Sequence, residues 1–409
     1  MIRQTNTSRK KILGLAMLAL SLMVVGCLND AKKTEDEKPL QLVQQEDKVF
    51  ALDTLTNYAY LVGKLFQNDN KTTYAFYNEA HSSIYVYDYE SGDLENVIKL
   101  KKEGPNGVPV IAMTYLIHSK DSIFINGHFA KDRLYIVNQK GEVIYKKPTD
   151  TINSDDSNLL IDSRFFEFDE ASYFSYPLLH TNVAFLQPQM GKPFPLRVAL
   201  NLTTNTLQDA YLDASMVIPK YEDYLVLSNE KRGDNLRTTT AGKGNHVFGS
   251  SQISDSIFEF NNGEFVKGYY ASNPKITLGD YKAHYESVSF IPITIGERSG
   301  IQAKNSPNRP PYFERTLIDL EGEWIYRFLV EKTELEKVAG SGYMRNKVVE
   351  MSIVAFNTKT KKSYTFKYPE AVDLNVRLWH VFANKNGIHF PILDQESESE
   401  KRYHVYKIE

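Results

Sequence analysis

Few residues in the chain have types and spacings that could support catalysis or metal binding. The chain contains one cysteine, Cys27, and nine histidines that are scattered singly along it. No H-E-x-x-H or H-x-H pattern and no cysteine–histidine cluster occurs, although a local zinc site requires such a pattern. The G-x-S-x-G elbow, the phosphate-binding loop and the dinucleotide fingerprint are missing as well. We therefore expect no cofactor and no local metal site, while a metal site assembled from separate strands stays open.

Two long polar segments, residues 229–251 and 296–315, contain the residues best suited to binding. Both are rich in basic side chains and in glycine or proline, so we expect them to be long loops. Basic loops on a rigid, acidic β scaffold would attract an anionic or carboxylate-bearing partner, and solvated loops without a partner are the alternative. The candidate binding residues are Arg232, Arg237, Lys243 and His246 in the first segment and Arg298, Lys304, Arg309 and Arg315 in the second.

The single cysteine follows a segment typical of a secretory signal peptide. Basic residues and no acidic ones precede an apolar run over residues 12–25, which is shorter than the about 20 residues of a membrane-spanning helix. The run ends in Gly26 and Cys27, and this order resembles the cleavage box of bacterial lipoproteins. The resemblance implies that residues 1–26 are removed and that acyl chains such as palmitate on Cys27 hold the protein on a membrane. An uncleaved anchor helix that ends at a free cysteine is the alternative.

The residues that follow the cysteine predict a tether and a destination. Leu28 rather than aspartate comes next, so the resemblance to lipoproteins implies the outer membrane. Acidic residues in the next stretch alternate with lysines, so the periplasmic and the surface face both stay open. Residues 27–47 are charged and poor in aromatic side chains, and we expect a flexible, lipidated tether before a body over residues 48–409.

Composition excludes some classes of protein. The 48 basic and 51 acidic residues give a net charge of −3, which argues against a general nucleic-acid binder. Loss of the leader would remove four positive charges and no negative one, which leaves a mature chain at −7. Because 42% of the residues are hydrophobic and 12% are aromatic, the body can bury a core and is not intrinsically disordered.

The body shows the alternation of apolar and polar residues that is typical of β-strands. We expect strands at residues 84–89, 133–137, 256–260, 324–328 and 403–408. One short helix is a candidate, over residues 329–338, where acidic residues recur at helical spacing. Turn-forming residues separate the strands at 89–93, 138–142, 201–205, 261–264, 320–323, 357–361 and 394–400.

The turns recur at roughly 40–60 residues, which is the range of β-propeller blades. We therefore predict an all-β propeller with six, possibly seven, four-stranded blades. A strand near residues 49–52 would pair with the terminal strand at 403–408 and close the ring, which removes exposed sheet edges. Two β-sandwich domains with a boundary near residues 147–157 are the alternative fold.

One turn motif adds a family resemblance. Gly104, Pro105, Asn106 and Gly107 follow a strand at residues 97–101, and a strand–turn–strand follows at residues 133–143. This pattern resembles that of the six-bladed propeller lipoproteins, which are related to NHL-repeat propellers and include domains of unknown function. The resemblance implies a membrane-anchored propeller.

The sequence favours a non-enzymatic binding or scaffolding module at the cell envelope. Its partner would be a protein, a peptide or a glycan, and its ligand is not specified by any motif. A metal-dependent hydrolase of the propeller lactonase type is the alternative, because similar propellers hold a divalent cation in their channel. That activity needs converging carboxylate and asparagine side chains, which no local motif shows.

Overall fold

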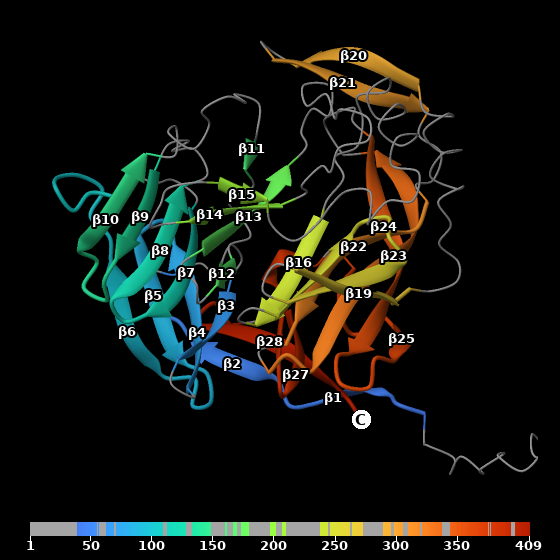
Figure 1. The fold of residues 1–409 in the computed structure, drawn as a ribbon, viewed down its shortest axis with the longest axis horizontal. Helices are drawn as coiled ribbons and strands as arrows, with labels where there is room; N and C mark the ends of the chain where they lie inside the picture. The colour runs from blue at the N-terminus through green and yellow to red at the C-terminus, as the bar shows by residue number, and fades with distance from the viewer. Residues whose placement is uncertain are drawn as a thin grey trace, which may run out of the picture. The chain divides into compact units, whose positions relative to one another are not determined.

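The chain folds almost entirely into antiparallel β-sheets (Figure 1). The only helix among the described residues is a short 3-10 turn, η3 (Leu378–His380), and no described helix has the length and apolar character to cross a membrane. The computed structural model describes residues 39–54, 56, 63–68, 71–108, 113–127, 133–148, 160–161, 167–169, 173–179, 197–201, 207–209, 238–243, 246–261, 264–272, 289–295, 298–305, 310–319, 321–337, 344–374, 376, 378–393 and 397–409.

Four sheets are each built from four strands that follow one another along the chain. This meander order is typical of propeller blades and differs from the Greek-key order of sandwiches. The first two sheets are β3 (Gly63–Asn68), β4 (Lys71–Asn78), β5 (Ser83–Asp88) and β6 (Leu94–Lys99), then β7 (Met113–Ser119), β8 (Ser122–Gly127), β9 (Arg133–Val137) and β10 (Val143–Pro148). The other two are β16 (Thr238–Lys243), β17 (His246–Ser251), β18 (Ser256–Asn261) and β19 (Glu264–Tyr270), then β22 (Tyr312–Ile318), β23 (Trp324–Lys337), β24 (Met344–Asn357) and β25 (Ser363–Lys367).

A fifth sheet joins the two ends of the propeller and confirms the predicted closure. It contains β26 (Phe382–Asn384), β27 (Gly387–Pro391), β28 (Glu400–Ile408), β1 (Leu42–Gln44) and β2 (Lys48–Ala51). Residues 48–51 of β2 lie opposite residues 403–400 of β28, so the pairing lies at and just before the start of the predicted terminal strand at residues 403–408. β1 pairs with β28 as well, so the propeller begins at Leu42 and not at Lys48. The tether boundary was placed too late because the hydrophilic residues around β1 hide a short edge strand.

Contacts between the first strands of the sheets run in a closed ring. β26 contacts β3 and β22, β7 contacts β3 and β12 (Glu167–Asp169), and β16 contacts β22 and β13 (Tyr173–Leu179). These first strands are therefore the inner strands of the propeller. One place in the ring is taken by a less regular sheet of β11 (Leu160–Ile161), β12 (Glu167–Asp169), β13 (Tyr173–Leu179), β14 (Arg197–Asn201) and β15 (Leu207–Asp209).

The number of regular blades differs from the prediction. In the sheet of β11–β15 the inner edge is broken into two short strands that both pair with β13. Among the described residues we count five blades with an unbroken inner strand, one fewer than the six expected. A separate two-stranded hairpin, β20 (Ser289–Ile295) with β21 (Arg298–Asn305), forms no blade. Two of the seven predicted turns, at residues 320–323 and 357–361, connect strands of one sheet, β22–β25, so the number of turns exceeds the number of blades.

The expected helix at residues 329–338 is wrong, because β23 continues through it to Lys337. Thr333 in this stretch is buried and lies opposite Val348 of β24, while Glu334 and Leu335 are exposed. The neighbouring β24 supplies backbone hydrogen-bond partners along the whole stretch. Tertiary pairing therefore outweighs the helical spacing of the acidic residues.

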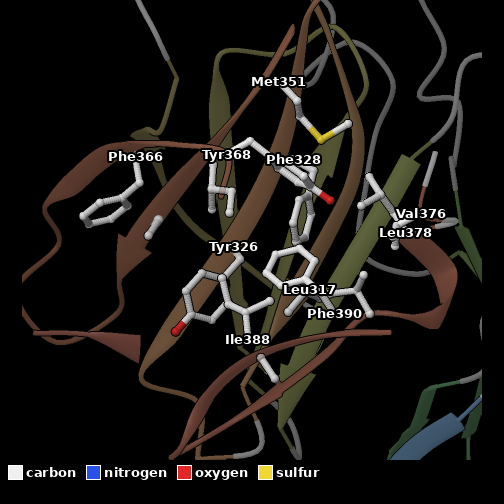
Figure 2. Packing of buried hydrophobic residues seen from close by; sticks show 14 of the residues in the cluster. Leu317, Tyr326, Phe328, Met351, Phe366, Tyr368, Val376, Leu378, Ile388 and Phe390 are labelled. Atoms are coloured by element: carbon white, nitrogen blue, oxygen red, sulfur yellow. The ribbon is translucent and has the colours of Figure 1, made fainter. Parts of the chain in front are cut away.

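Hydrophobic packing between blades explains why the strands form. Figure 2 shows the core that contains Phe328 of β23, Met351 of β24, and Ile388 and Phe390 of β27. Phe328, Ile388 and Phe390 are fully buried, and each such side chain contributes about 1.5–3 kcal/mol by leaving water. Because a blade has a neighbour on each side, strands such as β5 are buried on both faces, which masks strict alternation.

Candidate functional site

Two inner strands bring together two basic side chains, Lys64 of β3 and Arg315 of β22. Each side chain is half-buried, and the strands that carry them both contact β26. The Lys64 ammonium donates a hydrogen bond to the main-chain oxygen of Tyr115 on β7, with an Nζ–O distance of 3.3 Å. It also lies 5.4 Å from the centre of the Tyr115 ring, within range of a cation–π interaction. Lys64 is thus held by the neighbouring blade.

A β-bulge sets the position of Arg315. The pairing of β22 with β23 shifts register between Phe313 and Arg315, and bulges commonly redirect a side chain. The Arg315 guanidinium donates from Nη1 to the main-chain oxygen of Leu378, in the 3-10 turn η3. This contact fixes the guanidinium against the segment that leads into β26.

The two charges are held in a partly desolvated place where they repel each other. Burial and, to a smaller extent, the positive charge of Arg315 together lower the pKa of Lys64 to about 8. Burial also lowers the pKa of Arg315 to about 10. Both groups are cationic at neutral pH, and no carboxylate among the described residues forms an ion pair with either. Such a pair of cations can hold an anion.

A second polar cluster surrounds the carboxylate of Glu259 on β18. His246 approaches Glu259 Oε1 with Nε2 at 2.5 Å, and the Tyr269 hydroxyl donates to Oε2 at 2.5 Å. Lys361, in the turn between β24 and β25, donates to both oxygens at 3.1 and 3.2 Å. Burial opposes ionisation, but the hydrogen bonds from these three side chains hold the pKa of Glu259 below its usual value. The cluster joins two blades and satisfies its own charges, so we interpret it as structural.

Two other buried polar groups also have partners within the core. His389 is fully buried, and burial lowers its pKa to about 3, so the ring is neutral. Its Nε2 lies 2.7 Å from the Tyr89 hydroxyl and its Nδ1 lies 3.0 Å from the Gly387 oxygen, so Nδ1 donates and Nε2 accepts. Arg327, also fully buried, donates to the main-chain oxygens of Ala271 and Ser254. These groups lack access to solvent and stabilise the fold.

The candidate binding residues from the sequence are not brought into one site by the described structure. Arg232, Arg237 and Arg309 lie outside the described residues. Lys243 lies in β16, and Arg298 and Lys304 lie in β21, and only their backbone is described. His246 belongs to the Glu259 cluster, and Arg315 alone joins the inner-strand pair.

The expectation of two long loops is wrong for much of both segments. In the first segment β16 and β17 form a hairpin with Lys243 opposite His246. In the second, β21 pairs with β20, and β22 is the inner strand of a blade. Threonine-rich residues 238–240 favour a strand, but the basic and glycine residues around them hid that signal.

Two further features of the sequence are the single cysteine and the turn motif at residues 104–107. Cys27 lies outside the described residues. The turn motif connects β6 to β7: Gly104 has a φ of +86°, and its oxygen accepts a hydrogen bond from the Gly107 N–H at 2.9 Å. Pro105 and Asn106 form the turn, and the Asn106 side chain accepts from the Val143 N–H at 3.3 Å. The motif thus fixes the link between two blades.

Sequence reasoning missed Lys64. It stands alone in the strand sequence Gly-Lys-Leu-Phe-Gln-Asn, with no motif around it. Its partner Arg315 is distant along the chain, and only the ring topology brings β3 near β22. Among the described residues no group of three or more histidine, cysteine, aspartate or glutamate side chains could hold a metal ion.

Comparisons with known proteins identify a family and a solved structure of similar fold. The model of a family described as "Domain of unknown function (DUF4221)" matches residues 39–286, and no curated protein matches the chain in sequence. The solved structure of a DUF4221 member from Bacteroides vulgatus is similar, with 16% identity and a TM-score of 0.61 over 91% of this chain and 99% of that one. A putative exported protein from Bacteroides fragilis has 12% identity and a TM-score of 0.49, over 91% and 96% of the two chains. The Swd1 β-propeller domain from Myceliophteria thermophila has 8% identity and a TM-score of 0.38, over 88% and 99%.

Proposed function

The chain belongs to the DUF4221 family, and we propose that it is a lipid-anchored, non-enzymatic binding module of the bacterial cell envelope. The observation that carries the binding role is the pair of half-buried cations, Lys64 and Arg315, on two inner strands of the propeller. Fixed cations that contact only main-chain oxygens and an aromatic ring can bind and orient an anionic group without forming a bond to it. The scaffold therefore suits recognition.

The anchor is supported by the order of residues before the propeller. A basic start, a short apolar run and Gly26 precede Cys27, and the first strand begins at Leu42. Residues 28–41 would then form the tether, with a root-mean-square reach of about 20 Å if flexible. This reach keeps the propeller close to the membrane. The absence of aspartate after Cys27 favours the outer membrane as its location.

The partner that we propose is a glycan, a peptide or a protein of the envelope that carries an anionic group. The basic residues of segments 229–251 and 296–315 other than His246 and Arg315 are proposed as further partner contacts, since they would add positive charge to an acidic body. No nucleic-acid partner is proposed, because the chain has no excess of positive charge.

Membrane fractionation of cells that express the full chain tests the anchor. The wild-type protein should sediment with outer membranes and incorporate labelled palmitate, and Cys27→Ala should do neither. Leu28→Ala is the matched control, because it alters the neighbouring side chain and keeps the lipidated sulfur. Membrane association of Cys27→Ala equal to that of the wild type would contradict the anchor.

A further inference from the structure

We propose that Lys64 and Arg315 form a binding site for an oxyanion group, either a carboxylate or a sulfate or phosphate ester, on the ligand of this propeller. This inference rests on the proposed binding function and names the chemistry that the ligand must offer.

The placement of the two side chains favours a shared ligand. β3 and β22 flank the same inner strand, β26, which carries Phe382, Ala383 and Asn384 and no charged residue. Lys64 and Arg315 are close enough for the charge of one to disfavour protonation of the other. Each residue remains partly exposed.

The hydrogen bonds of the two side chains leave donors free for a ligand. An ammonium has three N–H donors and a guanidinium has five, yet Lys64 uses one on the Tyr115 oxygen and Arg315 uses one on the Leu378 oxygen. Among the described residues neither cation has an acidic partner. Lys361, whose side chain is 34% exposed, shows the contrast, because it is paired with the carboxylate of Glu259.

The electrostatics select an anion with more than one acceptor oxygen. A partly buried cation without a counter-ion raises the free energy of the folded state, and a second cation beside it raises that free energy further. A bound anion would relieve both the desolvation and the repulsion. The planar guanidinium suits two oxygens at once, while the ammonium adds a point charge that tolerates several geometries. A carboxylate and a tetrahedral ester both meet this requirement.

Isothermal titration calorimetry on the full chain in a non-ionic detergent tests the site. Sodium sulfate and sodium acetate are titrated separately at pH 7, with sodium chloride at equal ionic strength as the blank. We expect saturable binding of at least one probe in the millimolar range. Lys64→Met and Arg315→Met should each weaken it by about tenfold or more, since each removes a charge-assisted contact. Lys385→Met is the matched control, because it removes an exposed lysine that is paired with Glu90, and it should change affinity by less than about twofold.

The outcomes separate the two sources of the oxyanion. Tighter sulfate binding assigns a sulfate or phosphate ester, and tighter acetate binding assigns a carboxylate. If Arg315→Met does not fold, Lys64→Met and Arg315→Lys are compared instead, and both should weaken binding. The inference is overturned if neither probe binds saturably up to about 20 mM, or if the variants bind as tightly as Lys385→Met. Fractionation of Cys27→Ala is independent of these results, so failure of the site and failure of the anchor can be distinguished.

Discussion

Replacing Phe50 by alanine should loosen the closure of the ring. Phe50 lies in β2, which pairs with β28 and so connects the start of the propeller to its end. Its side chain is fully buried, and its ring stacks on Tyr74 with 3.8 Å between centroids. Tyr87 and Tyr403 pack edge-on at 5.8 and 6.2 Å. The substitution would therefore leave a cavity enclosed by rings from two blades.

The expected loss of stability follows from the size of that cavity. Replacing a fully buried phenylalanine by alanine costs about 3–5 kcal/mol, because the surroundings relax only in part. For a propeller over residues 42–409 the unfolding entropy is about 0.8 kcal/mol per kelvin, so Tm should fall by about 5 K. Differential scanning calorimetry of the wild type and the variant, in the same detergent and at equal concentration, measures this shift.

A second phenylalanine provides the control. Phe265 lies on the edge strand β19 with 46% of its surface exposed, and Phe265→Ala should change the stability by less than about 0.5 kcal/mol and Tm by less than about 1 K. Equal and small shifts for both variants would contradict the closure, because they would mean that β2 does not pack on the ring in solution.

Three further substitutions test contacts within the blades. Gly387→Ala should destabilise the protein by about 3 kcal/mol or more, because Gly387 has a φ of +122° and an added Cβ would meet the main-chain oxygen of Tyr406 at 2.1 Å. An unchanged Tm in this variant would refute that geometry. Tyr89→Phe should cost about 1–3 kcal/mol in chemical denaturation, since it leaves the buried Nε2 of His389 without a donor, and an unaltered midpoint would contradict the hydrogen bond. Glu259→Gln should be less stable than the wild type near pH 7, and this difference in stability should shrink as pH falls below about 4.5. The reason is that a carboxylate whose pKa is lowered by folding loses its stabilising charge when it is protonated. A difference in stability that does not change with pH would exclude the ionised cluster.

Much of the fold could be predicted because strand signals are local. Alternation at residues 84–89 and 403–408 corresponds to β5 and β28, and the proposed pairing of residues 49–52 with the last strand is confirmed. Closure could be inferred because an open array of blades would leave sheet edges unpaired. Where each strand lies could thus be read from residues close together in the chain.

The remaining features depend on which strands become neighbours. The stretch at residues 329–338 has helical spacing, and it forms a strand only because β24 lies beside it. The predicted blade count exceeds the five regular blades because the sheet with the broken inner edge has the same turn signal as a regular blade, and because one blade contains two of the predicted turns. Lys64 had no motif, and its significance depends on Arg315, which the ring brings near from a distant part of the chain.

Proton uptake on sulfate binding tests the cation pair most directly. Burial lowers the pKa of Lys64 to about 8, and the charge of Arg315 contributes. The phenol that faces Lys64, that of Tyr115 on β7, has a pKa raised well above the usual value by burial and stays neutral, and β26 carries no titratable group. Sulfate stays fully ionised above pH 7. Its negative charge should therefore raise the pKa of Lys64, so that the Lys64 amine takes up a proton when sulfate binds at pH 8.5.

The measurement is sulfate titration calorimetry in two buffers of different ionisation enthalpy, at pH 7 and at pH 8.5. If Lys64 and Arg315 bind the sulfate, we expect almost no proton uptake at pH 7 and uptake of about half a proton or more at pH 8.5. Lys64→Met should abolish this difference between the two pH values. Equal uptake at both pH values, or uptake that persists in Lys64→Met, would contradict the assignment of the site.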